Sequence, residues 1–255
     1  MKKTGNLGKI VLGIVLIAVI VAIGALCYGF YKKMTLKAEN PVAIIEVEGY
    51  GKMTVELYPE FAPNTVANFI KLASNGFYDG LTFHRILKGT VVQGGDPLGS
   101  GTGGATLKDL NEQNEEKDYA IEGEFYYNGY KNNTIRHEEG VISMARSDYS
   151  TYGLTKEGYD SASSQFFIMT SAVPAYDGYY AAFGKVTEGL DVLHNIEKVE
   201  LKKGEDGKET TEPAEAVKIK SITVDTKGFE YKMPKTHEPF DIVSWFMDKY
   251  VTVSK

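Results

Sequence analysis

The sequence is poor in the residues that build disulfide frameworks and metal centres. Its 255 residues include one cysteine, Cys27, so no intrachain disulfide framework can form. Only four histidines occur, and the one in RHEEG, residues 136–140, lacks a second histidine at metal-ligand spacing. The glycine-rich run GSGTGG, residues 99–104, has neither the lysine spacing of a phosphate-binding loop nor a helix after it, so it predicts a tight loop. No metal or cofactor is expected.

Acidic residues are absent from the first 33 positions, which carry five lysines. The rest of the chain therefore has 28 − 5 = 23 basic residues against 34 acidic ones, a net charge of −11. A body with this charge repels the phosphate backbone of nucleic acids. Nucleic acid is accordingly not an expected partner.

One long apolar run stands near the N-terminus. Residues 10–30 read IVLGIVLIAVIVAIGALCYGF, without a charge and with lysines on both sides. As a helix this run spans about 30 Å, which predicts a transmembrane anchor at residues 10–31 after a short N-terminal segment, residues 1–9. The alternative is a cleavable signal peptide, but its apolar region is usually about 7–15 residues and is followed by small residues at a cleavage site. The membrane is therefore an expected partner.

The orientation of the predicted anchor rests on the lengths of its flanks. Lysines lie at both ends, so the positive-inside bias nearly cancels. The short N-terminus and the long body that follows favour a single-pass protein with an extracytoplasmic body.

After a polar linker, residues 32–40, the pattern becomes that of a mainly β domain. Residues 41–63 predict a hairpin, since Met53, Val55 and Leu57 alternate with polar residues after a glycine turn. Apolar residues at helical spacing predict helices at residues 63–73 and 190–199. Further strands are predicted at VVQ, VISMA, QFFIMT, AAFGKV and KIKSITVD. Many short strands with two helices indicate a closed antiparallel barrel whose helices could plug its ends.

The C-terminal extension, residues 226–255, contains an amphipathic pattern. In PFDIVSWFMDKY, residues 239–250, a helix starting at the proline places five apolar residues on one face: Phe240, Val243, Phe246, Met247 and Tyr250. Packing of this helix on its own domain is favoured, and a partner-binding or membrane-surface helix is the alternative.

Six blocks in the body carry a resemblance to a known family. They are FHRILKGTVVQGGD (83–96), GTGG (101–104), EF (124–125), GVISMAR (140–146), SSQFFI (163–168) and FGKV (183–186). In this order they resemble the cyclophilin family of peptidyl-prolyl cis-trans isomerases, over residues 41–225, in a membrane-anchored, bacterial-like form. The resemblance implies an eight-stranded antiparallel barrel capped by two helices. It also implies isomerisation of X-Pro bonds without cofactor or metal.

The resemblance also implies an active site. Arg85 matches the family's catalytic arginine, which would stabilise the twisted imide, and Gln93 matches a glutamine that helps hold this arginine and the substrate backbone. Phe167 matches the floor of the proline pocket. The other substrate-binding positions implied in this way are Ala145, Arg146, Ser147, Val91, Thr90, Tyr176 and Tyr180.

Three positions depart from the family pattern. Thr90 lies where the family usually has an aromatic wall, Ala175 where many members have tryptophan, and Tyr180 where many have histidine. The loop at residues 147–162 is also longer than in compact members. Two functions therefore stay open: an isomerase that assists folding of extracytoplasmic proteins, with proline-containing peptides and unfolded clients as partners, and a low-activity module that binds proline-containing segments.

Overall fold

The computed structural model describes residues 5–35, 39–111 and 114–251, in two units that comprise residues 1–39 and 40–255. In the first unit, α1 (Gly5–Thr35) is one continuous helix. Its stretch Gly8–Gly29 is long and apolar enough to cross a membrane, a test that a signal sequence also passes, so the anchor stays a prediction. The segment 1–9, the linker 32–40 and the extension 226–255 each lie partly outside the described residues.

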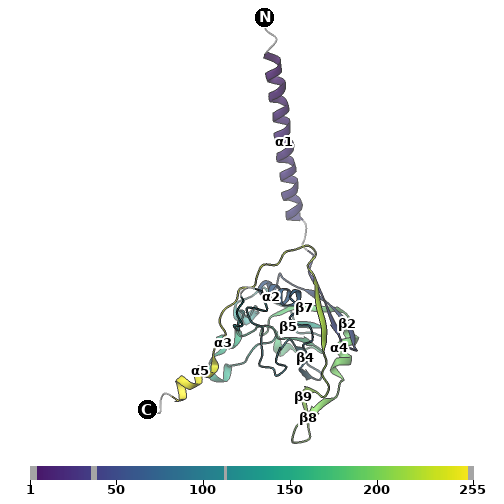
Figure 1. Cartoon of the computed structure of the whole chain (residues 1–255), viewed down its shortest axis with the longest axis vertical. Coiled ribbons are helices and arrows are strands. Elements are labelled where there is room, and N and C mark those ends of the chain that lie inside the picture. The colour runs from purple at the N-terminus through teal and green to yellow at the C-terminus, as the bar shows by residue number, and fades with distance from the viewer. Residues whose placement is uncertain (1–4, 36–38, 112–113, 252–255) are drawn as a thin grey trace. The chain divides into compact units, whose positions relative to one another are not determined.

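The second unit is built on one eight-stranded antiparallel sheet, which confirms the predicted architecture (Figure 1). The strand order is β10-β1-β2-β7-β5-β6-β4-β3. The strands are β1 (Val42–Val47), β2 (Gly51–Leu57), β3 (Arg85–Leu87), β4 (Val91–Gly94), β5 (Val141–Met144), β6 (Phe166–Met169), β7 (Ala182–Glu188) and β10 (Ile219–Asp225). Each strand segment predicted from the sequence supplies one of them.

An irregular segment, rather than a continuous strand ladder, joins the two edges of this curled sheet. The amide of Phe83 donates to the carbonyl of Val217 at 2.9 Å, and the amide of Ile219 donates to the carbonyl of Leu81 at 2.7 Å. Thr82 forms isolated bridges to both Asp96 and Lys218. The residues just before β3 thus connect the β3 edge to the approach to β10.

Two helices pack against the sheet, close to the predicted ranges. α2 (Pro63–Ser74) begins at a proline and packs against β10, and α4 (Leu190–Glu197) packs against β2 and β4. Phe69 of α2 is fully buried, with its ring centroid 5.3, 5.6 and 5.2 Å from those of Tyr78, Phe166 and Phe183. This aromatic cluster fills the centre of the core.

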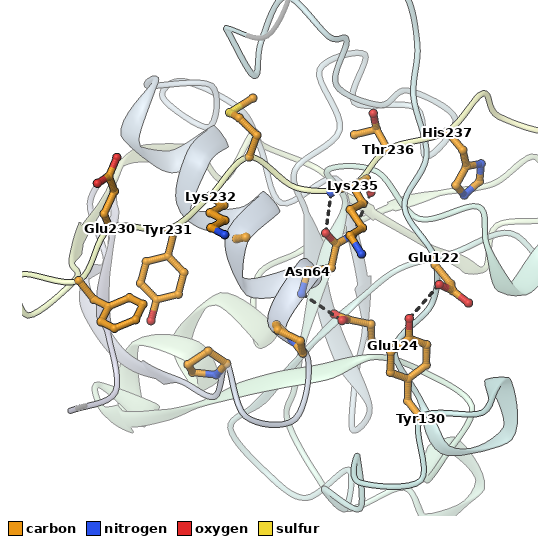
Figure 2. Close-up of a pocket in the computed structure, with 15 residues that line it drawn as sticks. Asn64, Glu122, Glu124, Tyr130, Glu230, Tyr231, Lys232, Lys235, Thr236 and His237 are labelled. Carbon is orange, nitrogen blue, oxygen red and sulfur yellow. Dashed lines mark hydrogen bonds between the residues drawn. The ribbon is translucent and has the colours of Figure 1, made fainter. Parts of the chain in front are cut away.

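The first turn of α2 is capped by a residue from a distant loop. Ala62, at the N-cap position, has no side-chain acceptor of its own. The carboxylate of Glu124 accepts a hydrogen bond from the amide of Asn64 at 3.0 Å (Figure 2). It accepts another from the amide of Thr65 at 2.7 Å. Glu124 is only 2% exposed, and this burial raises the pKa of its carboxyl group while the two amide bonds oppose the rise.

Several shorter elements have no counterpart in the sequence-based prediction. They are the strand β3, the hairpin β8 (Leu201–Lys203) and β9 (Glu209–Pro213), the helix α3 (Thr155–Tyr159) and the 3-10 turns Tyr126–Asn128, Ser150–Tyr152 and Pro174–Tyr176. The predicted C-terminal helix is shorter than expected: α5 covers Ile242–Phe246, followed by a π-helical turn at Met247–Val251. It does not start at Pro239, because Asp241 caps it by accepting from the amides of Val243 at 3.0 Å and Ser244 at 2.9 Å.

Candidate active site

Three of the predicted site residues lie in one row across neighbouring strands. Arg85 of β3 is paired with Gln93 of β4, and Gln93 is paired with Phe167 of β6. Residues directly opposite each other in antiparallel strands place their side chains on the same face of the sheet. The alternate residues Ile86 and Ile168 are fully buried in the core, so the row faces the outside of the curled sheet.

A chain of hydrogen bonds holds the guanidinium of Arg85. Its Nη1 donates to Oε1 of Gln93 at 3.0 Å, and Nε2 of Gln93 donates to Oε1 of Gln165 at 2.9 Å. Nε2 of Gln165 in turn donates to the carbonyl of Gly103 at 2.8 Å. These bonds fix the orientation of both amides and place a permanent positive charge at the edge of the row.

The glycine-rich run at residues 99–104 serves as the far support of this chain. The carboxylate of Asp96 accepts from the amides of Leu98 at 2.8 Å, Ser100 at 2.9 Å and Gly101 at 2.5 Å. A Cβ at Gly103 would lie 2.1 Å from Oδ1 of Asp96, so this position excludes a side chain. Amides of the loop therefore donate to Asp96, and the carbonyl of Gly103 accepts the hydrogen bond from Gln165.

Beside the row lies a small apolar cluster that is separate from the core. Phe167, 4% exposed, and Val91, 2% exposed, form its base, and Ala145, Tyr176 and Tyr180 pack against them. The Phe167 ring centroid is 5.3 Å from that of Tyr180 and 6.0 Å from that of Tyr176. Burial raises the pKa of Tyr180, which the positive charges of Arg146 and Arg85 oppose. The structure thus brings five predicted site residues together next to Arg85.

Arg146 and Ser147 lie at the edge of this cluster. The guanidinium carbon of Arg146 is 4.7 Å from the ring centroid of Tyr180 and 4.9 Å from that of Tyr159. Its Nε donates to the carbonyl of Tyr179 at 3.0 Å and its Nη1 to the carbonyl of Ser147 at 2.9 Å. Since Tyr159 belongs to α3, Arg146 links the long loop at residues 147–162 to the apolar cluster.

The two departures at Thr90 and Ala175 are next in sequence to residues of the cluster, Val91 and Tyr176. Thr90 is half-buried in the turn before β4, where its amide donates to Leu87 and its carbonyl accepts from Thr170, each at 2.9 Å. Ala175 is exposed within a 3-10 turn.

A buried polar array behind Phe167 was not found by sequence reasoning. The His137 ring lies 6.2 Å from the Phe167 ring, its Nε2 is 3.0 Å from Oγ of Ser143, and its Nδ1 is 3.3 Å from Oδ1 of Asp177. Burial lowers the pKa of His137, which favours a neutral ring. Although a Ser-His-Asp series is also the order of a hydrolytic triad, Ser143 and His137 are 0% and 1% exposed, so a substrate cannot reach the hydroxyl. The array instead supports Phe167 from behind.

The domain has two cavities of similar size, and they differ in their relation to the predicted site residues. One, of about 710 Å³, is continuous with the site and is lined on that side by Gln93, Gln165 and residues 145–147. The other, of about 740 Å³, lies between the start of α2 and residues 229–237 and contains none of the predicted site residues (Figure 2). Within residues 5–35, 39–111 and 114–251, no group of three or more metal-ligating side chains is gathered.

Comparison with known proteins agrees with the fold. The family described as "Cyclophilin type peptidyl-prolyl cis-trans isomerase/CLD" matches residues 42–224. Peptidyl-prolyl cis-trans isomerase B of Bacillus subtilis is 42% identical over 157 residues, which cover 62% of this chain and 91% of that protein. Peptidyl-prolyl cis-trans isomerase-like 2 of Rhizopus delemar is 34% identical over 214 residues, which cover 82% of this chain but only 34% of that longer protein.

A solved structure of a cyclophilin type isomerase has a similar fold. The crystal structure of a cyclophilin type peptidyl-prolyl cis-trans isomerase from Cryptosporidium parvum, in the presence of the dipeptide Ala-Pro, matches with a TM-score of 0.57 and 27% sequence identity. The match covers 72% of this chain and 98% of that chain. Residues after 225, the C-terminal extension, lie beyond the family match.

Proposed function

Since this chain belongs to the cyclophilin-type family of peptidyl-prolyl cis-trans isomerases, we propose that the row of Arg85, Gln93 and Phe167 is its active site. The chain is an isomerase of X-Pro bonds by its family. What the proposal adds is the assignment of residues, the mechanism and the place of action.

The mechanism follows from the barrier to rotation about the X-Pro bond. This barrier is about 18–20 kcal/mol because twisting the bond breaks its C–N resonance. In the twisted state the prolyl nitrogen becomes pyramidal and gains a lone pair, which the guanidinium of Arg85 stabilises more than it stabilises either planar form. No covalent bond breaks and no proton moves, so the site needs neither a nucleophile nor a base.

The neighbouring residues supply binding and orientation. The apolar cluster around Phe167 and Val91 would receive the proline ring, since it is an outward-facing apolar surface beside the charged group. Gln93 holds the guanidinium through its 3.0 Å bond and so limits the motion of the charge during the reaction. The observation that carries the proposal is this bond, which fixes Arg85 in the same row as Phe167.

The test is turnover by the full-length chain in detergent. We expect it to accelerate isomerisation of a tetrapeptide with proline at its third position, followed by a coupled protease assay. Binding of the same peptide without turnover would reject the isomerase mechanism and favour the alternative, a binding module. Thr90, which is half-buried and stands where the family usually has an aromatic residue, is the feature that keeps this alternative open.

We place the isomerase domain outside the cytoplasm, where its clients would be exported proteins as they fold. The support is α1, whose stretch Gly8–Gly29 has the length and composition of a membrane span and is followed by the whole isomerase domain. Its large apolar side chains are more than half exposed, as in Leu26 at 75%, so the helix presents an apolar surface that lipid would cover.

If α1 anchors the chain uncleaved, the full-length protein should remain in the membrane fraction after high-salt and carbonate washes. Screening of charge does not reverse burial of about twenty apolar residues. Protease added to cells stripped of their wall should then digest the isomerase domain. A shortened soluble form in the medium would indicate cleavage instead, and protection from the protease would place the domain in the cytoplasm.

A further inference from the structure

The C-terminal extension runs as a strap over the isomerase domain. We use "strap" for residues 226–251, which follow β10 and lie beyond the family match at residues 42–224. The strap passes the start of α2 and ends in α5 beside the loop at residues 147–162. It is therefore an addition to the family domain, and the path it takes brings it to the proposed active site.

Backbone contacts fix the middle of the strap. The side chain of Asn64 pairs with the backbone of Lys235, accepting from its amide at 2.6 Å and donating to its carbonyl at 3.0 Å (Figure 2). His237 and Ala120 exchange two backbone hydrogen bonds of 2.9 Å each, as in an antiparallel bridge. The ammonium of Lys117 also pairs with the carboxylate of Glu238. This segment of the strap is thus held in one register.

The end of the strap packs on the long loop through aromatic rings. The ring centroids of Tyr149 and Phe240 are 6.1 Å apart, and those of Tyr152 and Phe246 are 4.9 Å apart. These packed rings place the residues on either side of the Asp241 cap next to the loop. The strap end and the loop therefore form a common wall.

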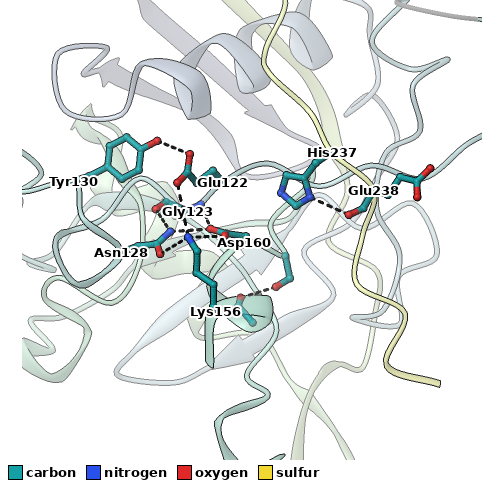
Figure 3. Close-up of polar contacts among 10 residues, drawn as sticks. Glu122, Gly123, Asn128, Tyr130, Lys156, Asp160, His237 and Glu238 are labelled. Carbon is teal, nitrogen blue, oxygen red and sulfur yellow. Dashed lines mark hydrogen bonds and ion pairs between the residues drawn. The ribbon is translucent and has the colours of Figure 1, made fainter. Parts of the chain in front are cut away.

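A polar network holds this loop against the domain. Lys156 of α3 pairs with Asp160 at 2.7 Å and donates to Oδ1 of Asn128 at 2.9 Å (Figure 3). The Asp160 carboxylate also accepts from the amide of Gly123 at 3.1 Å and from Nδ2 of Asn128 at 2.8 Å. The loop is consequently tied to the first 3-10 turn and to Gly123 before it, which gives the strap a fixed surface to pack on.

The cavity of about 710 Å³ lies between the strap end and the active site. Gln93, Gln165 and residues 145–147 line one side, and residues 240–243 of the strap line the other. We propose that the strap forms the outer wall of a substrate subsite in this cavity, which receives a long basic side chain from a residue that flanks the client's proline. This proposal rests on the proposed active site and adds a substrate preference to it.

The charges and apolar surfaces of the cavity favour a basic side chain. Asp118 and Asp241 both line it, and the hydrogen bonds that cap α5 hold the Asp241 carboxylate in place. Arg146, which also lines it, is engaged with tyrosine rings and with the carbonyls of Tyr179 and Ser147. Phe240, Ile242 and Val243 offer apolar surface along which the methylene groups of lysine or arginine could lie. Such a side chain would place its stem on the strap and its charge near the two carboxylates.

The preference is measured with full-length protein in detergent. Hexapeptides are compared that carry lysine, glutamate or alanine at one position flanking the proline, and each flanking position is varied in turn. The assay gives kcat/KM, and titration gives Kd. At one or more positions we expect the lysine peptide to exceed the glutamate peptide by about fivefold, because two partly solvated carboxylates contribute modestly. The double variant Asp118→Asn and Asp241→Asn should bring this ratio close to one. Asparagine at position 241 keeps the helix cap, since it is as good an N-cap as aspartate.

Two further variants separate the strap from general effects. Glu230→Gln removes a strap charge outside this cavity and should leave the ratio unchanged, while a chain ending at Glu238 should lose the preference as the double variant does. A wild-type ratio near one at every position, or a ratio that the double variant retains, would overturn the proposal. Absence of turnover with every peptide would defeat the proposed active site instead, and the Kd ratios would then still decide whether the strap subsite exists.

Discussion

Arg85→Ala is expected to lower kcat/KM by about two to three orders of magnitude, the usual effect of losing a group that stabilises transition-state charge. The loss should fall on kcat/KM for all proline peptides, since Arg85 acts on the twisted imide that they share. The fold should survive because Arg85 is on the outer face of an edge strand and is only partly buried. The coupled protease assay measures the rate, and circular dichroism checks the fold.

Two matched substitutions show whether this loss of rate comes from the guanidinium group at position 85. Arg136→Ala removes an exposed arginine outside the row and should leave the rate within about twofold of wild type, as for surface changes remote from a site. Arg85→Lys keeps a charge but loses the planar fork that meets Gln93, so an intermediate rate is expected. Full activity of the Arg85→Ala variant would remove the mechanism proposed here.

Glu124→Ala is expected to destabilise the isomerase domain by about 2–4 kcal/mol, which corresponds to a Tm lower by about 5–10 °C. The substitution leaves the amides of Asn64 and Thr65, at the start of α2, without their acceptor in a buried place. It also removes a side chain that borders the cavity beneath the strap. Thermal unfolding of the full chain in detergent, followed by near-UV circular dichroism, measures the change.

The neighbouring acid provides the control for this second substitution. Glu122 is exposed and bonds only at the surface, to the hydroxyl of Tyr130 at 2.8 Å and to Lys156 at 3.8 Å, among the contacts described for it. Glu122→Ala should therefore change the Tm by about 2 °C or less. Glu124→Gln keeps one acceptor oxygen and should fall between the two. Equal Tm values for Glu122→Ala and Glu124→Ala would show that the cap contributes little.

The elements with local patterns were predictable from sequence. Alternation at Met53, Val55 and Leu57 marks β2, and helical spacing after Pro63 marks α2, because a side chain's burial there depends on its neighbours in the chain. The row of Arg85, Gln93 and Phe167 has a different origin. The family resemblance predicts the roles of these residues, and the pairing of β3, β4 and β6 brings them side by side.

The remainder depends on contacts between distant residues that carry no local pattern. The hydrogen bond that the Asn64 amide donates to Glu124 spans 60 positions, and the one that the His137 amide donates to Asp177 spans 40. In the sequence, RHEEG suggests no role beyond a metal ligand, because nothing in its pattern points to Ser143 or Asp177 as partners of His137. The prediction that the C-terminal helix begins at Pro239 is wrong, because Pro239 and Asp241 are both residues that begin helices and the Asp241 side chain caps the helix.

The pairing of β1 with β10 sets the order in which this domain can be completed during synthesis. Val42, at the start of β1, pairs with Asp225, and residues 80–83 find their partners at 217–219. Until the ribosome has made β10, one side of β1 remains an unpaired strand edge, which is a template for aggregation. The domain is therefore a late folder with many long-range contacts, and a premature stop before residue 219 would release a chain with an open edge. The strap is made after β10, so the wall that we assign to the substrate subsite is added only after β1 has its partner strand.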